Sequence, residues 1–402
     1  MGPNKEYIKM RFSLGDAYVK ENRLKDIDKV DAVIFDCDGV LIDVRESYDK
    51  AIAKTVKWIF EAITGRTVTE ELVSDEIIFF FRRSGGFNDD CDIVYGALMF
   101  LLCELPIKFL EDLAKVIKSV GWEGGLSRLI NTMRGKLHLE DADWNVYALY
   151  DKLKEFTFML DETGISSVDR AILSSKNIPE EIYASLKNLL YGSKRVGESL
   201  ITTVFEEIFY GQKLFKRVYN IEPIVLHSLG TINNSSVIIK PETLERLSSL
   251  IGGAKFGIAS GSKISSTRYV LGSILDLFEQ RALVFSDDVE RVEDEYSSRG
   301  FLKVSLKKPN PYSLFRSAWS LEPFRMALYV GDSIEDALAV NKANMLDPRF
   351  MFAGVYAYTG AKDKALEEFL KFGCDIISPS VNEIPLIIEA VRGMRIEGDR
   401  VL

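Results

Sequence analysis

The apolar positions of this chain fall into two different patterns, and the first consists of short continuous apolar runs. Such runs are typical of strands buried on both faces of a parallel sheet. They lie at 32–35, 256–259, 282–285, 327–330, 352–356 and 375–377. Helical periodicity separates the runs that follow residue 240, so the pattern predicts βαβ units. We therefore expect an α/β fold with a doubly wound, Rossmann-like parallel sheet.

The second pattern is a long block of helical periodicity between the first apolar run and the others. At the start of the block, apolar residues recur every three or four positions until Gly65, where the run ends. Further helices are predicted at 93–110, 111–120 and 198–219. The block therefore reads as a large, mostly α-helical domain that is inserted after the first strand.

These patterns predict three parts of the chain. Residues 1–28 form an N-terminal extension with one helix expected at 16–26. Residues 29–43 and 235–402 form the α/β core, and residues 44–234 form the helical insertion. A length of 402 residues fits two domains of ordinary size.

Four polar segments follow predicted strands, the third of them after a longer loop. They are Asp36-Cys37-Asp38-Gly39-Val40, Ser260-Gly261-Ser262, Lys307-Lys308-Pro309-Asn310-Pro311 and Gly331-Asp332-Ser333-Ile334-Glu335-Asp336. Open α/β sheets bind their ligands at the carboxyl ends of the strands. We therefore expect these segments to meet at one edge of the sheet.

The two acidic segments suit carboxylate chemistry. Asp36 could attack an electrophile as a nucleophile, and Asp38 could act as a general acid and base. Asp332 together with Asp36 could supply oxygen ligands to Mg²⁺. The structural alternatives are an Asx-turn at the first segment and a helix N-cap at the second.

The two remaining segments suit an anionic ligand. The Ser260 hydroxyl and the unobstructed N–H of Gly261 could bind phosphate oxygens, and Lys308 could neutralise phosphate charge. The alternatives are a plain polar turn and a solvated basic loop.

Composition narrows the chemistry further. The chain has 60 acidic residues, 51 basic residues and a net charge of -9, which argues against a broad nucleic-acid surface. Its two histidines, His138 and His227, lie in no motif, so carboxylates must do most of any chemistry. The four scattered cysteines predict buried free thiols in a reducing cytosol. Without a signal peptide or a spanning segment, we expect a cytoplasmic protein with no membrane partner.

The four segments in this order, DxDGV, SGS, KPNP and GDSxxD, resemble the haloacid dehalogenase (HAD) superfamily. The resemblance covers roughly 29–43 and 235–402, and the helical block takes the position of the family's C1 cap. The chain looks like a phosphoglycolate-phosphatase-like member of subfamily I with an enlarged cap. It departs from the family in the charged insertion at 290–306 and in the length of the cap.

The resemblance implies a role for each motif residue. Asp36 would be the nucleophile that takes the phosphoryl group, and Asp38 the general acid and base. Mg²⁺ would be held by the Asp36 carboxylate, the Asp38 carbonyl and Asp332. Asp336 would support the ion through water or hold Lys308. Ser260 and Gly261 would bind the phosphoryl group, and Lys308 would offset its charge. An acid at Asp38 favours phosphatase or phosphomutase chemistry over dehalogenation.

The sequence therefore predicts a Mg²⁺-dependent phosphatase that acts on a small phosphorylated metabolite, with no nucleic-acid partner. The alternatives are a phosphomutase on the same core and a non-catalytic binding or regulatory protein that uses the enlarged cap. In the cap, the loop at 85–90 offers Asn88 and Asp89 as substrate contacts, unless it only caps the following helix.

Overall fold

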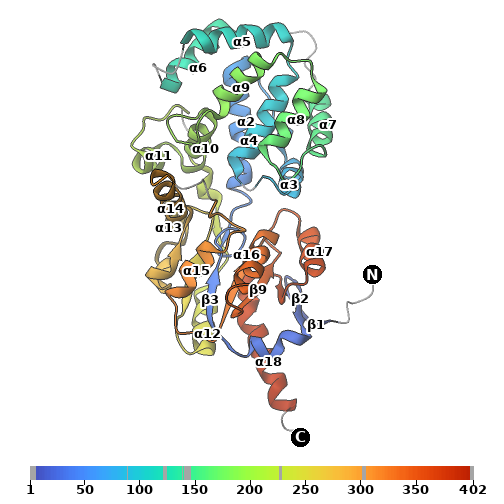
Figure 1. Ribbon diagram of the computed structural model, residues 1–402, viewed down its shortest axis with the longest axis vertical. Helices are drawn as coiled ribbons and strands as arrows, with labels where there is room; N and C mark the ends of the chain where they lie inside the picture. Colours follow the sequence, from blue (N-terminus) through green and yellow to red (C-terminus); the bar gives the residue numbers. More distant parts are fainter. Residues whose placement is uncertain are drawn as a thin grey trace. The chain divides into compact units, whose positions relative to one another are not determined.

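The computed structural model describes residues 6–87, 89–120, 125–137, 139, 146–225, 229–300 and 305–398. The chain forms two compact units, shown in Figure 1. The core unit consists of Met1–Arg45 and Ser235–Leu402, and the inserted unit is Glu46–Asn234. Within the described part of the chain, no helix has the length and apolarity needed to cross a membrane.

An eight-stranded sheet forms the centre of the core unit, in the order β1-β2-β10-β9-β8-β3-β6-β7. The strands are β1 (Tyr7–Phe12), β2 (Gly15–Lys20), β3 (Val30–Phe35), β6 (Phe256–Ala259), β7 (Leu283–Val284), β8 (Met326–Gly331), β9 (Phe350–Val355) and β10 (Ile376–Ser378). From β10 to β7 all neighbours are parallel. The α/β fold class with a parallel sheet is therefore confirmed. A separate pair, β4 (Ile42–Asp43) and β5 (Ser236–Val237), is antiparallel.

Helices cover both faces of this sheet, as expected for a doubly wound fold. Side chains alternate along β3, so that Val33 and Phe35 join one hydrophobic cluster while Ala32 and Ile34 join the other. The first cluster includes residues of α12 (Pro241–Ile251), α13 (Ile264–Leu271) and α18 (Ile384–Gly398). The second includes residues of α15 (Tyr312–Trp319), α16 (Ile334–Asn344) and α17 (Lys362–Phe372). Figure 1 shows blue β3 beside elements from the orange part of the chain, because β8 is its neighbour in the sheet.

The N-terminal extension differs from the prediction of a helix at 16–26. Residues 15–20 form β2, and only the short turns η1 (Glu21–Arg23) and α1 (Leu24–Ile27) are helical. Ala17 and Val19 are fully buried at alternate positions, and Val19 pairs with Ile376 of β10. Pairing with the sheet thus makes this segment a strand instead of the predicted helix. The inserted unit consequently follows the short strand β4, and β3 before it is the first strand of the parallel core.

The inserted unit is helical in its described residues, apart from loops. Its helices are α2 (Tyr48–Thr64), α3 (Asp75–Arg83), α4 (Asp90–Cys103), α5 (Ile107–Val120), α6 (Gly125–Lys136), α7 (Val146–Thr157), α8 (Ile165–Ser175), α9 (Glu180–Tyr191), α10 (Leu200–Tyr210) and α11 (Gln212–Tyr219), with 3-10 turns η2 (Glu70–Val73) and η3 (Thr231–Asn234). The predicted helices at 93–110 and 198–219 are each divided in two. Pro106 precedes α5, and Gly211, with φ of 73°, separates α10 from α11.

The last two predictions for the fold concern the charged insertion at 290–306 and the four cysteines. The charged insertion at 290–306 lies partly in α14 (Ser286–Ser298), which precedes the Lys-Pro motif. The other short turns of the core unit are η4 (Gly272–Leu277), η5 (Gln280–Ala282) and η6 (Val381–Glu383). All four cysteines are free and buried, as predicted.

Candidate active site

Asp36 lies directly after the central strand β3. Its backbone N–H donates to the carbonyl of Val330 on the neighbouring strand β8, at 2.9 Å. The side chain accepts a hydrogen bond from the N–H of Cys37 at 2.8 Å, and the residue is only 8% exposed. Two parallel strands that are buried on both faces therefore fix this carboxylate at the carboxyl end of β3.

Lys308 forms ion pairs with two carboxylates of this site. Its Nζ lies 2.9 Å from Oδ2 of Asp36 and 2.7 Å from Oδ1 of Asp336. Burial lowers the pKa of Lys308, but the charges of Asp336 and Asp36 outweigh that effect and raise the pKa well above its usual range. The side chain is therefore a permanent ammonium. The adjacent Lys307 instead pairs at the surface with Glu290, at 3.2 Å.

Asp336 is held rigidly at the start of α16. It forms a capping box with Ser333, whose N–H and hydroxyl donate to Oδ2 at 3.2 and 2.7 Å. Asp336 is fully buried, and its other oxygen, Oδ1, forms the ion pair with Lys308. The GDSxxD segment thus serves both purposes that the sequence left open, because it caps a helix and also brings a carboxylate into the site.

Three carboxylates come together beside this single ammonium. Asp36, Asp332 and Asp336 each place one oxygen within 4.8 Å of the others. Burial raises the pKa of Asp332 well above its usual range, and the charges of Asp336 and Asp36 raise it further. Such a cluster favours a bound cation with oxygen ligands, and its donor set fits Mg²⁺.

Gly39 allows the loop after Asp36 to pass close to Asp332. Its φ is 70°, and a Cβ at this position would lie 2.1 Å from Oδ2 of Asp332. Any side chain here would displace that carboxylate, so the glycine is needed for the close approach of the two motifs.

The SGS segment lies at the end of β6, next to β3. The N–H of Ser260 donates to the carbonyl of Val284, at 3.0 Å. The hydroxyls of Ser260 and Ser262 are 3.0 Å apart, and Ser262 donates to Oδ2 of Asp38 at 2.8 Å. A Cβ on Gly261 would meet nothing within 4 Å, so space remains open beside this residue. The structure therefore brings Ser262, which the sequence argument left without a role, against the predicted acid.

Tyr329 is a second residue that the sequence argument missed. Its hydroxyl lies 2.8 Å from the carbonyl of Ala259 and 3.0 Å from Oδ1 of Asp336. Its ring centre lies 5.4 Å from the ammonium of Lys308. The available signal was a hydroxyl in a strand buried on both faces, since such a group needs a partner.

Asn88 and Asp89 are the two residues of the inserted unit that were predicted to contact the substrate. Asn88 lies outside the described residues. Asp89 is the N-cap of α4, where its side chain accepts from the N–H of Cys91 at 3.0 Å, and it also lies 3.4 Å from Lys194. Asp89 thus has the capping role that the sequence offered as the alternative, while its contact with a substrate stays a prediction.

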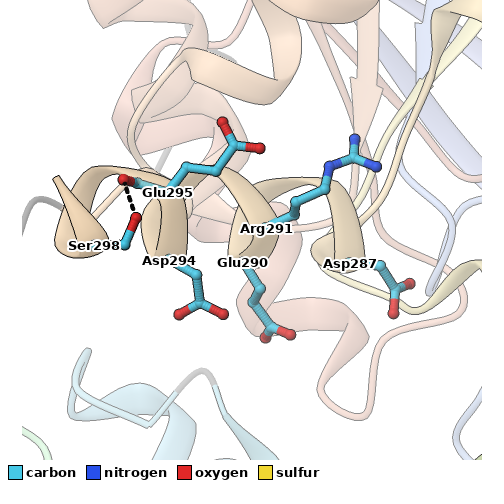
Figure 2. Close-up of a pocket in the computed structure, with 6 residues that line it drawn as sticks. All are labelled: Asp287, Glu290, Arg291, Asp294, Glu295 and Ser298. Atoms are coloured by element: carbon cyan, nitrogen blue, oxygen red, sulfur yellow. Dashed lines mark hydrogen bonds between the residues drawn. The ribbon is translucent and has the colours of Figure 1, made fainter.

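A surface hollow of about 560 Å³ lies along α14 in the core unit. Figure 2 shows its six lining side chains, all from this helix, with the Ser298 hydroxyl donating to the carbonyl of Glu295. The lining carries four carboxylates and one guanidinium, so it repels anions. We assign no phosphate site there.

Comparisons with known proteins bear on the fold. No protein-family model matches the chain, and no curated protein matches it. An X-ray structure of a Northeast Structural Genomics Consortium target is similar at 18% identity, with a TM-score of 0.62, over 90% of this chain and 98% of that chain. This likeness shows a shared fold alone.

Two other solved structures are less similar. Phosphatase Tt82 from Thermococcus thioreducens is 20% identical with a TM-score of 0.42, over 83% of this chain and 98% of that chain. A haloacid dehalogenase-like hydrolase from Bacteroides fragilis is 16% identical with a TM-score of 0.36, over 89% of this chain and all of that chain. At such TM-scores neither likeness carries an argument. The parallel core with an insertion between the first two motifs is nonetheless the fold class that the resemblance implied.

Proposed function

We propose that this protein is a HAD-type phosphoric monoester hydrolase that uses Mg²⁺ and acts on a small phosphorylated metabolite through an aspartyl-phosphate intermediate. One observation carries the proposal. Asp36, Asp332 and Asp336, from the segments that follow β3 and β8, form a largely buried cluster with Lys308, and the Asp38–Ser262 pair lies beside it. This combination of carboxylates and one ammonium suits phosphoryl transfer, which depends on positioning and charge neutralisation.

The reaction has two steps. In the first, an oxygen of Asp36 attacks phosphorus, the bond from phosphorus to the ester oxygen breaks, and Asp38 gives its proton to the departing alcohol. In the second, water attacks the phosphorus of the aspartyl phosphate while Asp38 takes a proton from that water. Inorganic phosphate leaves and Asp36 returns to its carboxylate form.

Charge is the main obstacle to the first step, because an anionic carboxylate must approach an anionic phosphate. Lys308, 2.9 Å from Asp36, offsets part of that repulsion. The Ser260 hydroxyl and the Gly261 N–H would bind the phosphoryl oxygens. Asp36, Asp332 and the Asp38 carbonyl would hold Mg²⁺, with Asp336 in support. When bound, the ion supplies further positive charge for the phosphoryl oxygens.

The test is a phosphate-release screen of the full chain with Mg²⁺, across sugar phosphates, phosphoglycolate, nucleotides and polyol phosphates. We expect release from at least one ester and a loss of more than about 10³-fold in kcat for Asp36→Asn. The matched control is Asp294→Asn on the exposed face of α14, which should keep full activity.

Each failure has a different meaning. Full activity of Asp36→Asn would contradict the nucleophile, and absence of release from every ester would contradict the phosphatase and favour a binding or regulatory role. An isomerised product that requires a bisphosphate activator would instead identify a phosphomutase.

A further inference from the structure

Ser262 lies two residues beyond the serine that is proposed to bind the phosphoryl group. It is only 7% exposed, and its hydroxyl donates to Oδ2 of Asp38 at 2.8 Å. Asp38 is the proposed proton donor, so Ser262 touches the group that must be aimed at the leaving oxygen. The sequence motif alone gives no reason to distinguish Ser262 from a turn residue.

The position of Ser262 is itself fixed by the start of α14. The carbonyl of Ser262 accepts two hydrogen bonds from Ser286, from the N–H at 3.0 Å and from the hydroxyl at 3.1 Å. One residue further along α14, Asp287 accepts from the N–H of Ile264 at 3.0 Å. The loop is therefore held by α14 at Ser262 itself and two residues beyond it.

Counting protons shows how the two serines are connected. The hydroxyl of Ser262 has one hydrogen, which goes to Asp38, so its oxygen can only accept in the 3.0 Å contact with Ser260. The N–H of Ser262 in turn donates to the Ser260 hydroxyl oxygen at 3.1 Å. The Ser260 hydroxyl thus holds in place the Ser262 hydroxyl that donates to the proposed acid.

We infer that Ser262 is a positioning residue that orients the carboxyl group of Asp38 for proton transfer to the leaving group. This inference rests on the proposed function. The Ser262 hydroxyl can donate to Oδ2 both when Asp38 carries a proton on Oδ1 and when it is ionised, so the contact persists before and after that proton moves. Ser262 therefore fixes the rotation of the Asp38 carboxyl group through both steps of the reaction.

The test compares two classes of ester in the same preparation of full-length protein with Mg²⁺. p-Nitrophenyl phosphate releases a stable phenolate that needs little protonation, whereas an alkyl phosphate such as glycerol phosphate releases an alkoxide that needs a proton. For Ser262→Ala we expect kcat/KM, which reports the first step, to fall about 10- to 100-fold on the alkyl ester and less than about 3-fold on the aryl ester. Since both rates come from one sample, their ratio does not depend on the folded fraction.

Two further variants complete the design. Ser262→Thr keeps the hydroxyl and should return the ratio of rates to within about 3-fold of the wild-type ratio. Ser298→Ala, at the far end of α14, is the control that should leave both rates unchanged. Equal losses on both esters in Ser262→Ala, or no loss on either, would overturn the inference.

The proposed function has its own readout in this experiment. Asp38→Asn should lower kcat/KM on the alkyl ester far more than on the aryl ester if Asp38 is the acid. If Asp38→Asn shows no such preference, or the wild-type protein hydrolyses neither ester, the assignment of Asp38 fails and the role of Ser262 fails with it. If Asp38→Asn shows the preference and Ser262→Ala does not, only the inference about Ser262 is wrong.

Discussion

The ammonium nitrogen of Lys308 lies 2.9 Å from Oδ2 of Asp36 in a buried part of the core unit. A second carboxylate, that of Asp336, holds the same nitrogen from another side at 2.7 Å. Lys308 therefore does two things at once. It neutralises the proposed nucleophile before any ligand arrives, and it connects the loop before α15 to Asp36 after β3 and to Asp336 in α16.

Replacing Lys308 should damage both stability and catalysis. Lys308→Met keeps the length and the apolar stem but leaves Asp36 and Asp336 without their cation. Breaking a buried ion pair from one side costs about 3 kcal/mol or more, because the remaining charge is uncompensated. We expect that loss in the free energy of urea unfolding, together with a fall in kcat of at least about 100-fold.

Lys307→Met is the matched control for this prediction. Lys307 is half-exposed and pairs with Glu290 at the surface, so its replacement should change the free energy of unfolding by less than about 1 kcal/mol. If the two variants had equal effects on stability and turnover, the assignment of Lys308 to the site would be wrong.

Gly39 and Gly261 offer a second matched pair, since both lie in loops of the site. Gly39→Ala would place a methyl group 2.1 Å from Oδ2 of Asp332 at a φ of 70°, so we expect a destabilisation of about 2 kcal/mol or more and a loss of turnover. A Cβ on Gly261 meets nothing within 4 Å, and alanine keeps the N–H. Gly261→Ala should therefore stay within about 1 kcal/mol of wild type in urea unfolding. An unaffected Gly39→Ala protein would contradict the close approach of the two loops.

The parts of the fold that can be predicted from sequence are those whose own residues carry a clear hydrophobic pattern. The strand at 256–259 was expected at the residues that form β6, because its apolar run ends sharply at a polar turn. β2 was missed, since its alternation of Ala17 and Val19 is short and lies among charged residues. That segment becomes a strand by pairing with β10, whose partner residues lie more than 350 positions away.

The same distinction applies to the site. Asp36, Asp332 and Lys308 stand in short motifs, so their residue types and order pointed to one edge of the sheet. Tyr329 and Ser262 were not predicted, because partners from separate segments give them their roles. These partners are Ala259 and Lys308 for Tyr329, and Asp38 for Ser262. Only the folded chain shows which hydroxyl meets which carboxylate.

Metal binding should be visible in stability as well as in turnover. Without Mg²⁺ the carboxylates of Asp36, Asp332 and Asp336 repel one another, and Lys308 offsets only part of that repulsion. Adding Mg²⁺ after EDTA treatment should raise the free energy of unfolding by about 1–3 kcal/mol, depending on the ratio of concentration to Kd.

Asp332→Asn tests this account with a change of sign. In EDTA the variant should be more stable than wild type by about 1 kcal/mol, because one repelling charge is gone. With Mg²⁺ it should lose most of the stabilisation seen in the wild-type protein. Asp294→Asn, on the exposed face of α14, should respond to Mg²⁺ like wild type. An equal Mg²⁺ response in all three proteins would show that the ion binds elsewhere.

The inserted unit should make stability depend on pH through Glu207. This residue is fully buried in α10, where its carboxylate accepts from the N–H groups of Ile224 and Val225, each at 2.7 Å. Burial raises the pKa of Glu207 from 4.5 to about 7, although the two N–H groups act in the opposite direction. The folded state therefore binds this proton more tightly than the unfolded state does. Its contribution to stability is complete below the unfolded pKa and is lost as pH rises through about 7.

A shift of this size corresponds to about 3 kcal/mol, at about 1.4 kcal/mol for each pH unit. Glu207→Gln does not titrate, so the decrease in free energy of unfolding between pH 5 and pH 8 should be smaller by about that amount than in wild type. Urea unfolding of the full chain, followed by far-ultraviolet circular dichroism, measures it. Glu71→Gln, on an exposed turn of the same unit, should keep the wild-type dependence. If Glu207→Gln kept it too, another group would be responsible and Glu207 would be ionised in the folded protein at neutral pH.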